Sequence, residues 1–146
     1  MTRIRAIAFN PDGKIMLSAG YDQVLKLWDM ETGRLKQTLE GHASGVASAV
    51  ISRDGNRIAS AGSDGSLKCW SVGAAKLLAI FQLLPPVEEG EASVDWIAFT
   101  PDWYYQSSAG AKKWIRWRSG GELSTAEKHE SSFARPEMLA KALEVN

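Results

Sequence analysis

Short runs with apolar side chains at alternate positions follow one another along the first part of the chain. They are "IRAIAF", "KIMLSA", "VLKLW" and "RLKQTL", and then "VASAVI", "RIASA", "LKCW" and "KLLAIF". Runs of this length and alternation are typical of β-strands. Asp-Gly pairs at 12–13, 54–55 and 64–65 supply tight connections between strands. The pattern therefore predicts two antiparallel sheets, each with four strands.

The two predicted sheets repeat one another at a constant offset. "MLSAGYDQVLKLW" at 16–28 matches "IASAGSDGSLKCW" at 58–70, which begins 42 positions later. Repetition at such a period predicts an array of stacked units, and units of about 40 residues have the size of a β-propeller blade. A sandwich of short strands remains an alternative, but it gives no reason for the constant period.

A third unit begins with "SVDWIAFTPD", at an offset of 48 and after an insertion near "LLPPVEEGE". Phe99 and Ser108 fall on the repeat positions, and in the ungapped register Lys112 and Arg118 replace the repeated Asp and Trp. A one-residue gap would instead align Trp117 with the Trp, but alternation favours the ungapped register. We expect no fourth strand after Arg118, because the segment that follows is polar.

These boundaries give an all-β partial propeller with two four-stranded antiparallel blades, a three-stranded third and a short C-terminal helix. The expected segments are blade 1 at 1–40, blade 2 at 41–84, an acidic Pro-containing loop at 85–92, an incomplete blade 3 at 93–118, and a tail at 119–146 with a helix near 136–144. Pro136 suits the first turn of that helix, which has one apolar side.

The chain resembles the WD-repeat family of β-propellers over roughly residues 3–118. The resemblance rests on "LWD" at 27–29, its variant "CWS" at 69–71, and "GH" at 41–42, together with the repeated Pro-Asp-Gly and Ser-Ala-Gly. Residues 99–143 look like the segment that ends the propeller in many bacterial WD-repeat proteins, in which a caspase-like peptidase domain is often attached elsewhere. Trp103 departs from the pattern, because Gly is expected there and a bulky residue tolerates positive φ poorly.

The resemblance implies a buried tetrad in each blade. Blade 2 has the whole set as His42, Ser60, Asp64 and Trp70; blade 1 has Ser18, Asp22 and Trp28; the third unit has only Ser108. The imidazole can donate to the carboxylate, and the hydroxyl can bridge the imidazole and the indole N–H. Ser, His and Asp are also the residue types of a hydrolase triad, but the chain has no "GxSxG" elbow, so we expect a structural role and no catalytic residues.

Composition excludes several other classes of function. Lys plus Arg equals Asp plus Glu at 17 each, so no net charge recruits nucleic acid or an anionic membrane. "AKKWIRWR" interleaves basic residues with Trp, as a single-strand binding site would, but we expect a strand with a solvated basic face. One cysteine and two histidines without ligand spacing predict no metal, and no glycine-rich loop predicts a cofactor.

The single cysteine, Cys69, fits a reducing compartment, and we expect it to be a small buried hydrophobic residue. The N-terminus lacks an apolar signal segment, and no apolar run has the length of a membrane span. The sequence therefore predicts a soluble, cytoplasmic chain.

We expect a non-catalytic scaffold for protein–protein contacts. The candidate contact residues are Arg5, Tyr21, Ala47, Ser63, Asp95, Glu88 and Glu89. The alternative is a regulatory or sensing segment of a larger bacterial enzyme, such as a caspase-like peptidase. Because a partial array leaves apolar flanks in water, the expected partners include the remaining blades of a propeller or further copies of the chain.

Overall fold

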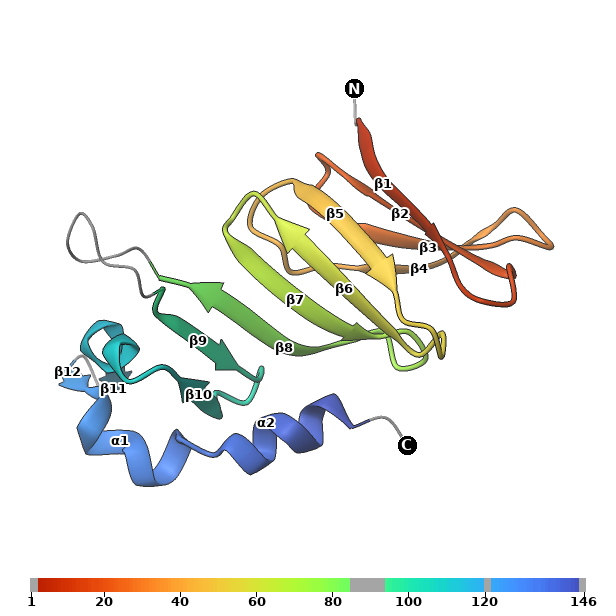
Figure 1. The fold of residues 1–146 in the computed structure, drawn as a ribbon. Helices are drawn as coiled ribbons and strands as arrows, with labels where there is room; N and C mark the ends of the chain where they lie inside the picture. Colours follow the sequence, from red (N-terminus) through yellow and green to blue (C-terminus); the bar gives the residue numbers. More distant parts are fainter. Residues whose placement is uncertain (1–2, 85–93, 120–121, 145–146) are drawn as a thin grey trace.

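The computed structural model describes residues 3–84, 94–119 and 122–144. The first sheet, which we call blade 1, is four-stranded and antiparallel, with its strands side by side in chain order (Figure 1). These strands are β1 (Ile4–Phe9), β2 (Ile15–Gly20), β3 (Leu25–Asp29) and β4 (Leu35–Leu39). Within the described residues, no helix is long and apolar enough to cross a membrane.

Blade 2 repeats this arrangement with β5 (Val46–Ile51), β6 (Arg57–Gly62), β7 (Ser66–Ser71) and β8 (Lys76–Leu83). Its register is that of blade 1: Leu17 pairs with Leu27 in blade 1, and Ala59 pairs with Cys69 at the equivalent positions of blade 2. The mostly β architecture and the partial-propeller fold class are thus confirmed.

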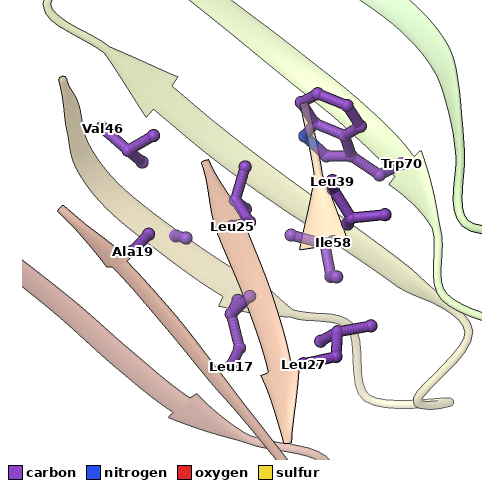
Figure 2. Close-up of a cluster of buried hydrophobic side chains, with 9 residues drawn as sticks. Leu17, Ala19, Leu25, Leu27, Leu39, Val46, Ile58 and Trp70 are labelled. Atoms are coloured by element: carbon purple, nitrogen blue, oxygen red, sulfur yellow. The ribbon is translucent and has the colours of Figure 1, made fainter. Parts of the chain in front are cut away.

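The two blades pack face to face through an apolar core (Figure 2). Side chains alternate across a strand, so one face of each sheet can be apolar while the other carries different residues. Blade 1 contributes Leu17, Ala19, Leu25, Leu27 and Leu39; blade 2 contributes Val46, Ala49, Ile58 and Trp70. Each of these nine side chains is buried, so the interface between the blades is a core in its own right.

The third unit was expected to form a separate three-stranded blade, but it does not. Its strands β9 (Trp96–Phe99) and β10 (Tyr105–Ser107) extend blade 2, giving a six-stranded sheet in the order β10-β9-β8-β7-β6-β5. The outer edge of β8 carries backbone groups without partners in blade 2, and β9 satisfies them by antiparallel pairing from Ile80↔Phe99 to Leu83↔Trp96.

The segment after β10 also differs from expectation. A 3-10 helix, η1 (Gly110–Trp114), stands where a strand was expected, and β11 (Arg116–Ser119) pairs with β12 (Glu122–Thr125) in a separate hairpin. The expectation of no strand after Arg118 is therefore wrong. A further helix, α1 (Ala126–Phe133), follows in a segment whose polar composition gave no sign of it.

The predicted C-terminal helix is α2 (Pro136–Leu143), with Pro136 in its first turn as expected. It covers the face of the six-stranded sheet that points away from blade 1 (Figure 1). Leu139 is buried against Ala79 of β8 and Ala98 of β9, and Leu143 packs beside them. The helix therefore completes a second, smaller core on the far side of blade 2.

Candidate functional site

The structure brings together the four residues of the predicted tetrad in blade 2. The His42 ring lies between Asp64, 3.0 Å from Nδ1 to Oδ2, and Ser60, 2.8 Å from Nε2 to Oγ. The Trp70 indole N–H donates to the same Ser60 oxygen at 2.8 Å. The chain of contacts joins the loop before β5 to strands β6 and β7 and the turn between them.

Asp64 accepts further hydrogen bonds that sequence inspection missed. The Ser66 hydroxyl donates to its Oδ1 at 2.7 Å, and the Ser66 and Ala43 backbone N–H groups donate at 3.0 and 2.9 Å. Burial by itself raises the pKa of the Asp64 carboxyl, but these bonds and the one to His42 outweigh it and hold the pKa well below its ordinary value. The carboxylate is therefore ionised over the whole neutral range.

The tetrad has the bonding pattern of a hydrolase triad without its accessibility. Ser60 is only 2% exposed, and His42 is buried with it. The indole N–H of Trp70 occupies an acceptor site on the hydroxyl that would have to attack a substrate. A nucleophile must reach its substrate, so this arrangement ties strands together and is unsuited to acyl transfer.

Blade 1 has the shorter version of this network. Trp28 Nε1 donates to Ser18 Oγ at 2.8 Å, as Trp70 does to Ser60, and Lys26 Nζ lies 2.5 Å from Asp22. A cavity of about 150 Å³ lies beside these four residues, on the side where blade 2 holds its imidazole. The lysine repeats as well, since Lys68 is buried, donates to the Gly41 carbonyl and lies 3.8 Å from Asp64.

In the third unit a different carboxylate meets the repeated serine. The Ser108 hydroxyl donates to Asp95 Oδ1 at 2.8 Å, and Lys113 lies 3.8 Å from the other oxygen of that carboxylate. Asp95 precedes β9, so this contact depends on the pairing of β9 and β10 and has no counterpart in the first two units.

The repeat agrees with the comparison to known families. Residues 2–29 and 33–71 match the family described as "WD domain, G-beta repeat". Both segments are similar to WD repeats.

Segments of several curated proteins are similar to part of this chain. The match to "Lissencephaly-1 homolog" of Monosiga brevicollis is 39% identical over 51 residues, which is 35% of this chain and 12% of the relative. "WD repeat domain-containing protein 83" of Danio rerio is 43% identical over 51 residues, 35% of this chain and 16% of the relative. "General transcriptional corepressor TUP1" of Saccharomyces cerevisiae is 33% identical over 45 residues, 31% of this chain and 6% of the relative. These matches span only a small part of each relative.

The other predicted contact residues of the WD repeats fall into two groups. Arg5 and Tyr21 lie together on an exposed end of blade 1, with the guanidinium carbon 5.2 Å from the centre of the Tyr21 ring. Ala47 and Ser63 are exposed at the same end of blade 2, where Ser63 N–H donates to the Gly45 carbonyl and Gly45 lies against Tyr21.

Asp95 does not join that group, because it precedes β9, which is separated from β5 by three strands of the six-stranded sheet. Asp95 therefore lies apart from Arg5, Tyr21, Ala47 and Ser63 and stays a predicted contact residue. Glu88 and Glu89 lie outside the described residues.

Cys69 lies on the face of β7 opposite Trp70, half-buried beside the smaller core. Burial raises the pKa of its thiol, which keeps the sulfur protonated and a poor nucleophile. Within the described part of the chain, no group of three His, Cys, Asp or Glu side chains is arranged to hold a metal ion.

The outer face of blade 1 is a surface that sequence inspection identified only in general terms. Its exposed apolar side chains occupy the repeat positions that blade 2 buries against blade 1. Ile7 and Phe9 are 57% and 55% exposed, whereas their equivalents are the buried Ala49 and the partly buried Ile51. The same holds for Ile4, Met30 and Leu35, whose equivalents Val46, Val72 and Leu77 belong to the core between the blades or pack against it.

Proposed function

We propose that this chain is a non-catalytic scaffold whose WD repeats hold other protein surfaces. The observation that carries the proposal is the outer face of blade 1, where exposed apolar residues repeat the pattern of a face that is buried elsewhere in the same molecule. Contiguous apolar surface of this kind marks sites of protein contact. The inaccessible Ser60 supports the absence of catalysis.

The proposed occupant of this face is another blade. Blade 1 packs Leu17, Leu25 and Leu27 onto blade 2, so a sheet with leucines in that arrangement is complementary to the equivalent face of blade 1. In a longer natural propeller the occupant is a preceding blade. In the isolated chain the leucine face is already buried against blade 2, so we propose self-association in which the outer apolar faces of blade 1 from two copies meet.

Light scattering during size-exclusion chromatography at micromolar concentration tests this proposal. We expect a species larger than the monomer, and we expect Ile7→Glu with Phe9→Glu to shift it to the monomer. Leu123→Glu is the matched control, because Leu123 is equally exposed but lies on β12. A well-folded monomer with a sharp unfolding transition and no binding of a hydrophobic dye would contradict the proposal.

A separate measurement addresses catalysis. Esterase and peptidase assays on the unaltered chain and on Ser60→Ala should give the same background rate. Activity that is lost in Ser60→Ala while folding is retained would show that the tetrad is a working triad.

The alternative role, a regulatory segment of a bacterial caspase-like enzyme, draws no support from the relatives described above, which are eukaryotic. We propose a cytoplasmic location on the strength of the single protonated thiol, Cys69. Neither nucleic acid nor a membrane is a proposed partner, because the chain has no net charge.

A further inference from the structure

A cavity of about 620 Å³ lies among β9, β10, η1 and β11, away from the surfaces considered so far. Its volume is in the range of ligand-binding sites, and its walls are mostly aromatic and aliphatic. The residues that matter here are Phe99, Trp103, Tyr105, Trp114, Arg116 and Arg118. The cavity exists because β9 and β10 joined blade 2 and left β11 to form its own hairpin.

Trp103 has a left-handed backbone conformation, which among the described non-glycine residues it shares with Gln23 and Ala75. Its φ is +67°, and the equivalent turns of the first two units have Gly13 at +72° and Gly55 at +76°. All three turns close with the same hydrogen bond, from this residue's N–H to the carbonyl three residues earlier. Strain of this kind is often found at functional sites, and here it places an indole at the cavity.

Two indoles at the cavity are open to solvent. Trp103 is 61% exposed and stacks on Phe99, with ring centres 6.0 Å apart and planes 3° from parallel. Trp114 is 45% exposed and comes from η1. Exposed tryptophans lining a concave surface are typical anchors for a bound side chain.

The charge of the lining is one-sided. Two arginines and no carboxylate are among the described residues that line the cavity. The Arg116 guanidinium is oriented by its own backbone, since Nη1 donates to the Lys113 and Ile115 carbonyls at 2.7 and 2.9 Å. No carboxylate in the described part of the chain forms an ion pair with Arg116 or Arg118. The occupant should therefore be negatively charged as well as apolar.

The two neighbouring lysines are paired with carboxylates of the chain itself, which limits the basic surface at the cavity to a short stretch and favours a short occupant. Lys112 Nζ lies 2.5 Å from Glu130, and Lys113 Nζ lies 3.8 Å from Asp95. The basic run "AKKWIRWR" is thus half neutralised by carboxylates of the chain itself. A nucleic acid strand needs a continuous basic track for its phosphates, and among the described residues that line this cavity Arg116 and Arg118 are the two cations without a carboxylate partner.

We infer that this cavity binds a short acidic peptide segment of a partner protein, with a bulky apolar side chain between the indoles and a carboxylate on the arginines. Carboxylates match the planar guanidinium in geometry as well as charge. The inference rests on the proposed function only in that the ligand is a segment of a protein. It adds that this segment is acidic and carries a bulky apolar side chain.

Selection from a phage-displayed library of random short peptides on the full chain tests it. Counter-selection uses the double variant Trp103→Gly with Arg116→Glu. We expect enriched peptides to place Asp or Glu next to an aromatic or large aliphatic residue. Failure to enrich any peptide, or enrichment of peptides without acidic residues, would overturn the inference.

Calorimetry with a synthetic copy of the enriched peptide then locates the site. We expect Trp103→Gly and Arg116→Glu each to weaken binding about tenfold or more. The matched control, Arg34→Glu, reverses an exposed charge in blade 1 and should leave the affinity unchanged. The thermal midpoint of Trp103→Gly should stay close to that of the unaltered chain, because glycine relieves the backbone strain.

Two measurements keep the test decisive if a variant folds poorly. Trp114→Ala changes an exposed side chain and should weaken binding similarly, and the indole N–H resonances of the unaltered chain should shift on adding the peptide. Oligothymidylate that binds with the same sensitivity to these variants would assign the cavity to nucleic acid instead. A peptide whose binding is lost in Ile7→Glu but kept in Trp103→Gly would leave the scaffold function standing and refute the cavity as its site.

Discussion

At the scale of single residues, Gly62 determines how closely the tetrad can assemble. A β-carbon at this residue would lie 2.4 Å from both Asp64 Oδ1 and His42 Nδ1, which is inside van der Waals contact. The third unit has the same constraint, because a β-carbon at Gly110 would lie 2.4 Å from both oxygens of Asp95. In the second and third units the glycine of the repeated Ser-Ala-Gly is therefore required by the close approach of a polar side chain, whereas Gly20 of the first unit lies against the Arg3 carbonyl.

Gly62→Ala should lower the free energy of unfolding by about 1–3 kcal/mol, because the added methyl group pushes the imidazole and the carboxylate apart. Urea denaturation followed by tryptophan fluorescence measures this change. Gly73→Ala is the matched control, since nothing lies within 4 Å of a β-carbon built there. Equal effects of the two substitutions would show that crowding at the tetrad is not the cause.

Asp64 should make stability depend on pH in the acid range. Its pKa is lowered in the folded chain from an unfolded value of about 3.9, so the folded state favours the ionised form. That contribution is fully present above the unfolded pKa and is lost as pH falls toward the folded pKa. Denaturation of the unaltered chain and of Asp64→Asn should therefore differ most at neutral pH and converge in acid. A difference that stays constant down to strongly acid pH would contradict the assignment.

At the scale of elements, α2 stabilises the part of the six-stranded sheet that lacks contact with blade 1. Its Leu139 is buried against Ala79 and Ala98, and these three residues form a core separate from the one between the blades. Helix α2 packs on the face of the sheet that includes β9 and β10. Loss of this packing should therefore affect β9 and β10 more than blade 1.

Leu139→Ala should cost about 2–5 kcal/mol of local or global stability, as expected for a cavity in a core. Amide hydrogen exchange should show loss of protection first in β9 and β10, with blade 1 least affected. Lys141→Ala, on an exposed position of the same helix, is the control for helix propensity. Uniform loss of protection over both blades would show that the two cores unfold as one unit.

At the scale of the whole molecule, the array has two unlike ends. The outer face of blade 1 exposes apolar residues that are core positions in blade 2, whereas the far face of blade 2 is partly covered by α2. A repeat protein gains stability from each interface between units, so an unfilled face is a place where a further unit adds stability.

The thermal midpoint should therefore rise with protein concentration, because association that requires the folded state stabilises it by mass action. Calorimetric scans over a roughly hundredfold range of protein concentration measure this dependence. Ile7→Glu with Phe9→Glu should abolish it, and Leu123→Glu should preserve it. A midpoint that is independent of concentration in the unaltered chain would contradict self-association through this face.

Patterns along the chain predicted the two repeats, their strands and turns, and helix α2. These features depend on local or periodic signals: alternation of side chains, Asp-Gly turns, a Pro at a helix start, and matched residues at one offset. Ser60, Asp64 and Trp70 stand at repeat positions, whereas His42 has no repeated counterpart, so the whole tetrad followed from the resemblance to the WD-repeat family.

The arrangement of the third unit depends on strand pairing between segments that are distant in the sequence. The backbone N–H and C=O groups of β9 need hydrogen-bond partners, and the edge of β8 supplies them. Neither segment carries a local sequence signal for this pairing. That pairing moved Asp95 away from the rim, separated β11 from the sheet, and opened the cavity at Trp103 and Arg116. The glycines at the equivalent turns of the first two units predicted the positive φ of Trp103. The sequence did not predict which residues surround Trp103, because they come from strands whose pairing has no local signal.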